Sequence, residues 1–423
     1  MAAPMWKSVP CKISELCLDR TLACGQSFRW KEYVPGVWTG VIGDAVWQLR
    51  QTHSELFYKV YRNTCNGNQE TTIKSEIEAE PDLKTTAKAK KRKRNTQKTD
   101  GIKCVKIKEE TIENGVSQVQ VKQEIQEYSS LENSLKTSSD IKHEIIKDFD
   151  ILKDYFQLGI KLEDMYKTWS EVDKHFEEIS KQFTGIRMLR QDPVECLFSF
   201  ICSSNNHISR ITSMVDKLAE HYGQKILVTS CVDGVDFYAF PKVEALSAEG
   251  VEEKLRNLGF GYRAKYIQQS ARFIQDNGGE EWLYSLRGME YKDAKRNLVK
   301  LCGVGAKVAD CVALMCLDKP GSIPVDTHVW QIAARDYMPK LKQAKSLNDK
   351  LYDEIGDYFR NLWGPYAGWA HSVLFTADLK QFKDGKKENT EPLSPCDTNF
   401  HVGKLVVTCG EQVCTGTEPR NTG

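Results

Sequence analysis

The sequence predicts an α+β protein that is mainly helical, with a small antiparallel β-sheet in its N-terminal region. Two observations predict the sheet: Val37–Ile42 and Ala45–Leu49 have strand-like patterns around the turn Gly43-Asp44, and Phe57–Tyr61 makes a further strand. A third observation predicts the helices, because from about residue 149 the apolar residues recur at helical spacing.

The composition divides the chain into four regions. We expect an N-terminal antiparallel β domain at residues 6–64 and a helical domain at residues 146–380. Between them, residues 65–145 contain almost no aromatic side chains and are rich in Lys, Glu, Gln, Thr and Ser. Burial there cannot offset the entropy lost on ordering, so we expect a disordered insertion. Residues 381–423 are polar and are expected to form a flexible tail.

Charge and cysteine content restrict the classes of function. The 423 residues carry a formal net charge of +1, so any affinity for DNA must come from locally arranged Lys, Arg and backbone donors. The 14 cysteines indicate reduced thiols, and the late Cys396, Cys409 and Cys414 do not form a tight cluster of four. We therefore expect no metal and no cofactor. No apolar run approaches the roughly 18 residues of a membrane span, so we expect no membrane partner. We also expect the protein to be a monomer.

The insertion contains two patterns that suggest regulation. Lys88–Arg94 is a dense basic run, typical of a nuclear import signal or of a non-specific DNA-contacting arm, although solvated segments also contain such runs. We expect a nuclear protein and leave a mitochondrial form open. The pattern aliphatic-Lys-any-Glu resembles the acceptor motif for a small ubiquitin-like modifier, and composition alone is the alternative explanation. It occurs at Lys74, Lys108, Lys122 and Lys142.

The stretch Leu301–Tyr337 concentrates the residues that are suited to chemistry. Gly303 and Gly305, on either side of one valine, cannot continue a helix, because glycine loses the most backbone freedom there and tolerates positive φ. We predict a helix at about 290–302, a tight hairpin, and a second helix at about 306–317. Free N–H groups at such a helix start bind anions, and a DNA phosphate is the obvious candidate. The glycines alone also fit a plain helix connector.

Lys307 and Asp326 are the candidate catalytic residues. Lys307 falls in the first turn of the second helix, where the positive end of the helix dipole disfavours an ammonium and so favours the nucleophilic amine. Asp326 is expected to be the N-cap of a third helix at about 327–337, with a carboxylate that can act on whatever the amine attacks. Taken singly, a lysine is usually solvated and an N-cap aspartate is usually only a cap. Together, at this spacing, they are more specific.

These residues resemble the helix-hairpin-helix superfamily of base-excision glycosylases. Within it, most of residues 5–64 and 149–381 are similar to the 8-oxoguanine DNA glycosylase/lyase family, whereas the insertion and the tail are not covered. The resemblance implies a small sheet domain packed on a helical glycosylase core. It also implies that Lys307 attacks the sugar C1′ and that Asp326 supports loss of the base.

The resemblance further assigns a pocket for the damaged base. Gly25 matches the glycine whose carbonyl accepts the N7–H that 8-oxoguanine has and guanine lacks. Without the resemblance, Gly25 is most simply part of a turn that feeds a strand. Cys311 and Phe375 would lie on opposite faces of the flipped base. Spacing alone puts Cys311 on the same helix face as Lys307, and Phe375 is otherwise most simply a core residue.

His371 is a departure from the family pattern. It occupies the position where the family usually has a glutamine that reads the Watson–Crick edge of the base. A neutral histidine offers at most one donor and one acceptor, so we expect the base preference to shift or to become pH-dependent. Asp378 would orient His328, which would contact the phosphate near the lesion.

Four further residues are expected to contact the DNA. By resemblance, Asn205 fills the space left by the flipped base, Tyr262 is an aromatic wedge, and Arg210 and Arg263 contact the orphaned cytosine. His207 departs from the asparagine often found at its position. The residues alone leave a polar helix cap around Asn205 and an ordinary loop-to-helix junction at Tyr262 as alternatives.

The sequence therefore predicts a bifunctional DNA glycosylase with lyase activity, whose partner is double-stranded DNA containing oxidised guanine. We expect it to excise 8-oxoguanine and formamidopyrimidine opposite cytosine, and then to cleave the strand by β-elimination through a Schiff base on Lys307. Two alternatives remain open. One is a glycosylase for another damaged base, and the other is a non-catalytic DNA-binding module that uses the hairpin only to hold phosphate.

Overall fold

A computed structural model describes residues 4–63, 138–228 and 231–383 of the protein. The expected insertion and tail lie almost entirely outside the described residues, as do Lys74, Lys108 and Lys122. Helix α3 (Ser138–Tyr155) begins inside the range assigned to the insertion and contains Lys142.

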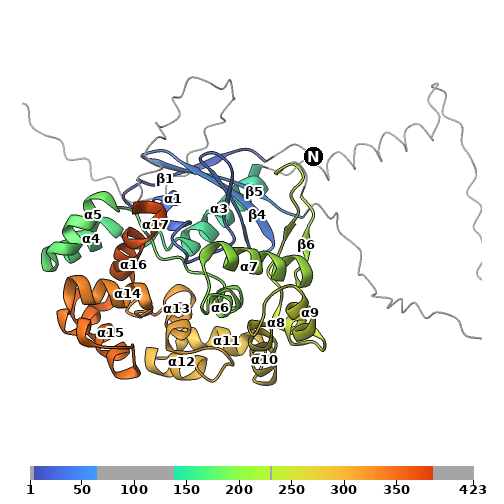
Figure 1. The fold of residues 1–423 in the computed structure, drawn as a ribbon. Helices are drawn as coiled ribbons and strands as arrows, with labels where there is room; N and C mark the ends of the chain where they lie inside the picture. Colours follow the sequence, from blue (N-terminus) through green and yellow to red (C-terminus); the bar gives the residue numbers. More distant parts are fainter. Residues whose placement is uncertain (1–3, 64–137, 229–230, 384–423) are drawn as a thin grey trace, which may run out of the picture. The chain divides into compact units, whose positions relative to one another are not determined.

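Five strands form one antiparallel sheet in the order β1-β5-β4-β3-β2, of which Figure 1 labels β1, β4 and β5. The predicted hairpin joins β3 to β4, with Val41 opposite Val46 and Trp38 opposite Leu49. The predicted antiparallel sheet is thus confirmed. The strands are β1 (Lys7–Pro10), β2 (Lys31–Val34), β3 (Val37–Ile42), β4 (Ala45–Gln51) and β5 (Glu55–Tyr61), and a separate pair is formed by β6 (Lys225–Ile226) and β7 (Phe237–Tyr238).

One hydrophobic core fixes the sheet to the helical part. Trp47 of β4 and Tyr58 of β5 belong to the same buried cluster as Leu152 and Tyr155 of α3. The Trp30 indole N–H donates to the Tyr155 hydroxyl at 2.9 Å, which satisfies a polar group inside this core. The sheet domain therefore packs on the helices, as expected.

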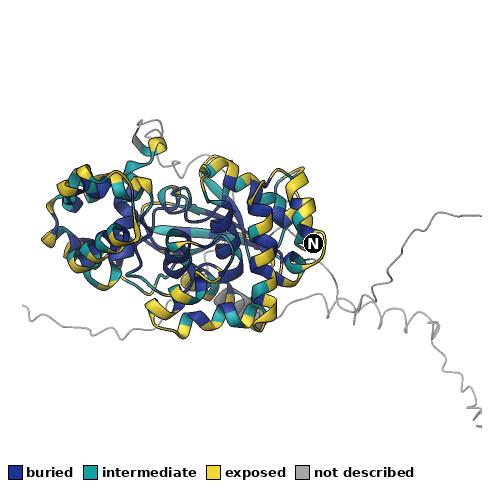
Figure 2. Ribbon diagram, turned by 60° about the horizontal axis from the view of Figure 1, so that its bottom comes forward, coloured by how far each residue is buried: buried dark blue, intermediate teal, exposed yellow. Residues whose placement is uncertain are grey.

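The helices form two hydrophobic clusters that meet at α13. Val308 and Val312 of α13 belong to the first cluster, with α6, α7 and α10, and Leu314 belongs to the second, with α4, α15 and α16. Figure 2 shows that buried residues fill the interior and exposed residues line the outer faces of the helices. The helices are α1 (Leu18–Thr21), α3 (Ser138–Tyr155), α4 (Leu162–Val172), α5 (Lys174–Gln182), α6 (Pro193–Cys202), α7 (Ile208–Tyr222), α8 (Val243–Ser247), α9 (Val251–Asn257), α10 (Arg263–Asp276), α11 (Glu280–Ser285), α12 (Tyr291–Leu298), α13 (Ala306–Cys316), α14 (Thr327–Ile332), α15 (Asp349–Trp363), α16 (Ala367–Asp378) and α17 (Lys380–Lys383), with shorter turns η1 (Leu286–Gly288), η2 (Ala333–Tyr337), η3 (Pro339–Gln343) and η4 (Gly364–Tyr366).

The predicted helix-hairpin-helix is present, with a shorter first helix than expected. α12 ends at Leu298 because the next turns tighten: the N–H of Leu301 donates to the Leu298 carbonyl, and that of Val304 to the Leu301 carbonyl. α13 begins at Ala306 as predicted.

α16 begins at Ala367, directly after η4. Gly368 lies in its first turn. A Cβ there would lie 2.4 Å from the Ser322 carbonyl oxygen, so this glycine permits close packing against the preceding loop.

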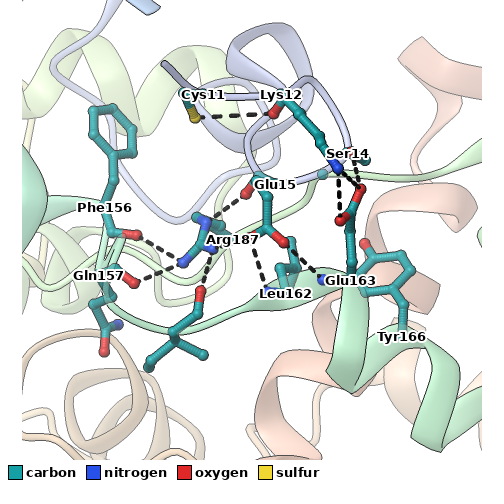
Figure 3. A network of polar contacts seen from close by, with 12 residues as sticks. Cys11, Lys12, Ser14, Glu15, Phe156, Gln157, Leu162, Glu163, Tyr166 and Arg187 are labelled. Carbon is teal, nitrogen blue, oxygen red and sulfur yellow. Dashed lines mark hydrogen bonds and ion pairs between the residues drawn. The ribbon is translucent and has the colours of Figure 1, made fainter. Parts of the chain in front are cut away.

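Arg187 ties the N-terminal segment to the start of the helical part (Figure 3). The side chain is 1% exposed, and its guanidinium donates to the Glu15 carboxylate at 2.6 Å and to the Gln157 carbonyl at 2.6 Å. It also donates to the carbonyls of Glu15 and Ile160. Five fixed N–H donors suit a site lined by several carbonyls, which a lysine would not satisfy.

The same glutamate caps a helix from a distant part of the chain. Glu15 Oε2 accepts from the Leu162 N–H at 2.9 Å and Oε1 accepts from the Glu163 N–H at 3.1 Å, both in the first turn of α4 (Figure 3). A carboxylate there is favoured by the helix dipole and satisfies two N–H groups that have no intrahelical acceptor.

We predict that Arg187→Met lowers the free energy of unfolding by about 3 kcal/mol, because it leaves Glu15 and several buried carbonyls without their donor. Urea unfolding followed by circular dichroism measures this change. Lys12→Met is the matched control, because it breaks the exposed Lys12–Glu163 pair in the same region, which is worth less than about 1 kcal/mol. Equal losses in both variants would contradict the role given to Arg187.

Candidate active site

Lys307 is the second residue of α13 and lies in its first turn, as predicted. The half-buried side chain extends over Phe200 of α6, with its Nζ 5.3 Å from the centre of the ring. The N-cap residue is Gly305, which supplies no side chain to cap the first-turn N–H groups. The hairpin therefore presents an amine beside a helix N-terminus that is suited to an anion.

Gly303 and Gly305 of the hairpin differ in backbone conformation and in the space around them. Gly303 has φ +79°, and a Cβ there would lie 2.3 Å from the ring of Tyr266, so only glycine fits. Gly305 has φ −88° with open space around it, so the expected positive φ applies to Gly303 alone. A side chain at 305 would instead obstruct the approach of a ligand to the N–H groups.

Asp326 is the N-cap of α14, as predicted. Its Oδ1 accepts from the N–H groups of His328 at 2.9 Å and Val329 at 3.0 Å. Within the described part of the chain, Oδ2 has no hydrogen-bond partner. One oxygen therefore fixes the carboxylate, and the other is left to act on a ligand.

The charges of Lys307 and Asp326 both reach the thiol of Cys311. Burial raises the pKa of the Cys311 thiol to about 11, the Lys307 charge and its hydrogen bond to the thiol lower it, and the Asp326 charge raises it. The predicted sharing of a helix face by Lys307 and Cys311 is therefore observed. The uncharged thiol belongs to the wall of the site.

His371 is buried in α16 and faces the same two charges. Burial lowers its pKa to about 4; Asp326 and the nearby Gly368 backbone oppose this shift, and Lys307 adds to it. Neither ring nitrogen has a well-aligned hydrogen-bond partner among the described residues. Buried polar groups are normally paired, so a neutral imidazole with two unused ring nitrogens is suited to a polar ligand.

Phe375 follows His371 by one helical turn. Their ring centres are 6.2 Å apart, and the edge-on contact of Phe375 with His328 is at 6.0 Å. The half-buried Phe375 thus lies between the buried histidine and the exposed one.

The turn at Gly25 is held rigidly beside α16. Gly25 has φ +82°, and a Cβ would come within 3.2 Å of Ile208. The buried Gln26 side chain donates to the carbonyls of Thr21 at 2.9 Å and Arg187 at 2.8 Å and accepts from the Leu189 N–H at 2.9 Å.

Two further contacts complete this support. The Gln191 side chain donates to the Gln26 carbonyl at 2.7 Å. Burial raises the pKa of Cys24, and hydrogen bonds with Gln26 and Thr376 lower it, so the Gly25 turn lies against α16.

Asp378 has a closer partner than the one expected. Its Oδ1 accepts from Arg335 at 3.2 Å, whereas His328 Nδ1 lies 3.8 Å from Oδ2. Arg335 was missed by the sequence analysis, because nothing in its local pattern distinguishes it from a solvated arginine. His328 is 51% exposed and lies where a ligand can reach it.

The four expected DNA contacts form a second group, around Ser204. Asn205 is exposed with φ +47°, a left-handed conformation that asparagine tolerates. The Ser204 carbonyl accepts from the Tyr262 hydroxyl at 3.1 Å and from Arg263 Nε at 3.0 Å. Arg210 is exposed and donates to the Gly259 carbonyl at 3.3 Å.

Arg263, which the resemblance assigns to the orphaned cytosine, is buried. It is 3% exposed, and its guanidinium also donates to the Asn205 carbonyl at 2.9 Å. In this structure it holds the turn that displays Asn205. Tyr262 remains 44% exposed, and its ring contacts Tyr266, which packs on Gly303. The second group is thereby linked to the hairpin.

The described residues include no group of three or more His, Cys, Asp or Glu side chains that could hold a metal ion. The late cysteines lie outside those residues. No described helix is long and apolar enough to cross a membrane.

Comparisons with known proteins match this fold and this hairpin. Residues 8–197 match the family described as 8-oxoguanine DNA glycosylase, N-terminal domain, and residues 198–355 match the HhH-GPD superfamily base excision DNA repair protein. The N-glycosylase/DNA lyase OGG1 of Arabidopsis thaliana is 43% identical over 258 residues, which cover 60% of this chain and 68% of the relative. The N-glycosylase/DNA lyase of Saccharomyces cerevisiae is 41% identical over 252 residues, 54% of this chain and 66% of the relative.

A solved structure has a similar fold. It is the Clostridium acetobutylicum 8-oxoguanine glycosylase/lyase in complex with double-stranded DNA containing cytosine opposite 8-oxoG. The TM-score is 0.58 at 21% identity, over 91% of this chain and 100% of that chain. The chain belongs to the 8-oxoguanine DNA glycosylase family and is an N-glycosylase/DNA lyase of base excision repair.

We predict that Gly303→Ala lowers the free energy of unfolding by about 2 kcal/mol or more, because it combines an unfavourable φ with a collision against Tyr266. Gly305→Ala, at an ordinary φ in open space, should change it by less than about 0.5 kcal/mol. Thermal and urea unfolding of both variants test this contrast. Similar stabilities for the two would refute the account of the hairpin.

We predict that His371 makes stability depend on pH. Its folded-state pKa of about 4 lies below the ordinary 6.5, so the unfolded chain binds a proton that the folded protein excludes. The stability is therefore fully present above about pH 6.5 and falls by about 3 kcal/mol as the pH drops towards 4. Urea unfolding at several pH values should show this loss in the wild type.

The loss should be absent from His371→Gln, which cannot titrate. His53→Gln replaces an exposed histidine and should keep the wild-type dependence. If His371→Gln loses stability on acidification as steeply as the wild type does, a neutral buried imidazole is ruled out.

Proposed function

We propose that this N-glycosylase/DNA lyase removes 8-oxoguanine, and ring-opened formamidopyrimidine, from pairs with cytosine, with Lys307 as the nucleophile. The observation that carries the proposal is that Lys307 and Asp326 lie at the starts of α13 and α14 and that the charges of both reach the buried Cys311 and His371. C1′ of a stacked nucleotide is inaccessible, so the damaged nucleotide must leave the duplex before the amine reaches it.

The chemistry of the proposed reaction is that of an amine at a sugar carbon. Lys307 Nζ forms a bond to C1′ as the bond from C1′ to the base breaks, and the base leaves with that electron pair and takes up a proton. Nζ then loses one proton, the C1′–O4′ bond breaks with its electron pair going to O4′, which takes up a proton, and Nζ is left joined to C1′ by the double bond of a protonated Schiff base. Loss of a C2′ proton expels the 3′ phosphate and cleaves the strand.

Asp326 supports this reaction electrostatically. Positive charge develops on the sugar as the base departs, and the Asp326 carboxylate, whose charge reaches the same Cys311 and His371 as that of Lys307, can stabilise it. The backbone N–H bonds to Oδ1 hold the carboxylate in place before the substrate arrives, so no reorganisation is needed at the moment of reaction.

Three features support the choice of base. His371 stays neutral and offers one donor and one acceptor. The Gly25 carbonyl is the proposed acceptor for the N7–H of the lesion, on a turn that is held by Gln26 and Gln191. Phe375 and Cys311 provide surfaces for the two faces of the ring. An undamaged guanine would leave the carbonyl unpaired, which disfavours it.

The preference for cytosine is assigned to the second group of residues. Arg210 and Asn205 are exposed at the start of α7, where an opposing base can be contacted. Tyr262 is exposed beside them and suits a wedge in a bent duplex. Arg263 acts by holding the Asn205 turn.

The proposal is tested by borohydride trapping on duplexes that contain 8-oxoguanine opposite each of the four bases. The wild type should form a covalent adduct, most rapidly opposite cytosine, and Lys307→Gln should form none because glutamine cannot make a Schiff base. Lys300→Gln is the matched control: it removes the same charge beside the same hairpin from an exposed side chain and should still be trapped. An adduct with Lys307→Gln, or equal rates opposite all four bases, would overturn the corresponding part of the proposal.

A further inference from the structure

A buried carboxylate joins the helix of Lys307 to the loop that ends at Asp326. Asp310 of α13 is 0% exposed and accepts four hydrogen bonds. Its Oδ2 accepts from Lys295 at 2.8 Å and from the Tyr352 hydroxyl at 2.5 Å. Its Oδ1 accepts from the Tyr291 hydroxyl at 2.7 Å and the Ser322 hydroxyl at 2.9 Å. A buried charge with this many donors is satisfied where it stands and resists displacement.

Tyr352 extends this network to the residue before Asp326. Its hydroxyl, 7% exposed as a residue, donates to Asp310 and accepts from the Val325 N–H at 3.3 Å. The Tyr352 hydroxyl donates its single hydrogen to the Asp310 carboxylate, because that contact is shorter and charge-assisted. Its oxygen lone pairs are then free to accept from the Val325 N–H. Burial raises the pKa of Tyr352, and the neighbouring Asp310 raises it further, so the hydroxyl keeps its proton.

The loop between α13 and α14 is thus held at two points. Ser322 is fixed to Asp310 directly, and Val325 is fixed to Asp310 through Tyr352. Asp326 follows immediately and caps α14. Asp310 lies three residues after Lys307, so the same helix sets the position of the amine and, through Tyr352, that of the carboxylate.

We infer that Tyr352 is a positioning residue, whose hydroxyl sets the placement of the Asp326 carboxylate relative to the Lys307 amine. This inference rests on the proposed function of these two residues. Tyr352 does not touch the substrate, so it should act on the rate of base loss and not on DNA binding. Tyr352→Phe keeps the ring, including its contact with Lys295 at 4.8 Å. It removes only the hydroxyl, with its bonds to Asp310 and Val325 and a longer contact with the Ile323 carbonyl at 3.4 Å in the same loop.

The experiment compares single-turnover excision of 8-oxoguanine opposite cytosine by the wild type and Tyr352→Phe. The variant should be about 10- to 100-fold slower, because sub-ångström misplacement of a catalytic group has effects of that order. Its affinity for a duplex with a non-cleavable abasic-site analogue should stay within about twofold of the wild type. A wild-type rate in Tyr352→Phe would overturn the inference.

Tyr166→Phe is the matched control for stability. The Tyr166 hydroxyl is also buried, donates to the Phe183 carbonyl at 3.0 Å and accepts from the Ile186 N–H at 3.3 Å. Its loss should lower the melting temperature by an amount comparable to that in Tyr352→Phe, yet leave the excision rate unchanged. Equal slowing in both variants would reduce the role of Tyr352 to general stability.

A double variant separates positioning from a merely structural effect. Tyr352→Phe added to Asp326→Asn should slow excision no further than Asp326→Asn alone, because the group it positions is already impaired. Losses that multiply would contradict the inference.

Hydrogen exchange provides a readout that does not depend on the substrate. The Val325 amide should exchange faster in Tyr352→Phe than in the wild type, and unchanged exchange would overturn the inference. A wild type that excises no 8-oxoguanine would instead refute the proposed function, and the exchange result would still decide whether Tyr352 holds the loop.

Discussion

The active site depends on a helix that is buried along its length and open at its first turn. α13 is packed between the two helical clusters, and its interior residues from Val308 onwards are almost all buried. A helix held on both sides cannot rotate or slide without losing packing on one of them. Lys307 lies at the end that emerges from this packing, so the position of the amine is set by the hydrophobic core and not by the hairpin alone.

Three side chains of α13 point in two different directions. Lys307 and Cys311 share one face, to which we assign the proposed base pocket, and Asp310 points into the network with Lys295 and Tyr352. The helical period of 3.6 residues permits this division within a little more than one turn. The buried Asp310 carboxylate is paired with its hydrogen-bond donors. The buried His371 remains neutral although the charges of Lys307 and Asp326 both reach it.

What the sequence predicted well follows local rules. The hairpin, the N-cap role of Asp326 and the shared face of Lys307 and Cys311 depend on residues a few positions apart. The sheet hairpin was found for the same reason. The error at the end of α12 arose because turn tightening depends on backbone contacts that the local pattern does not show.

The missed residues act across long stretches of chain. Arg187 reaches Glu15, and Tyr352 reaches Asp310 and Val325, with no periodic pattern to connect them. Asp310 did leave a signal, because a lone carboxylate inside the apolar run of α13 requires buried donors. The burial of Arg263 could not be foreseen, since its partners are backbone carbonyls, which every residue supplies.

The bracing of the Gly25 turn has a consequence for how selective the protein can be. In the proposed pocket, a flexible loop would move away from a base that cannot donate to the Gly25 carbonyl. The free-energy cost of binding the wrong base would then be smaller. The hydrogen bonds of Gln26 restrain the turn and prevent such a movement. Under the proposed function, discrimination against guanine therefore depends on the stiffness of the Gly25 turn as well as on the hydrogen bond that its carbonyl accepts.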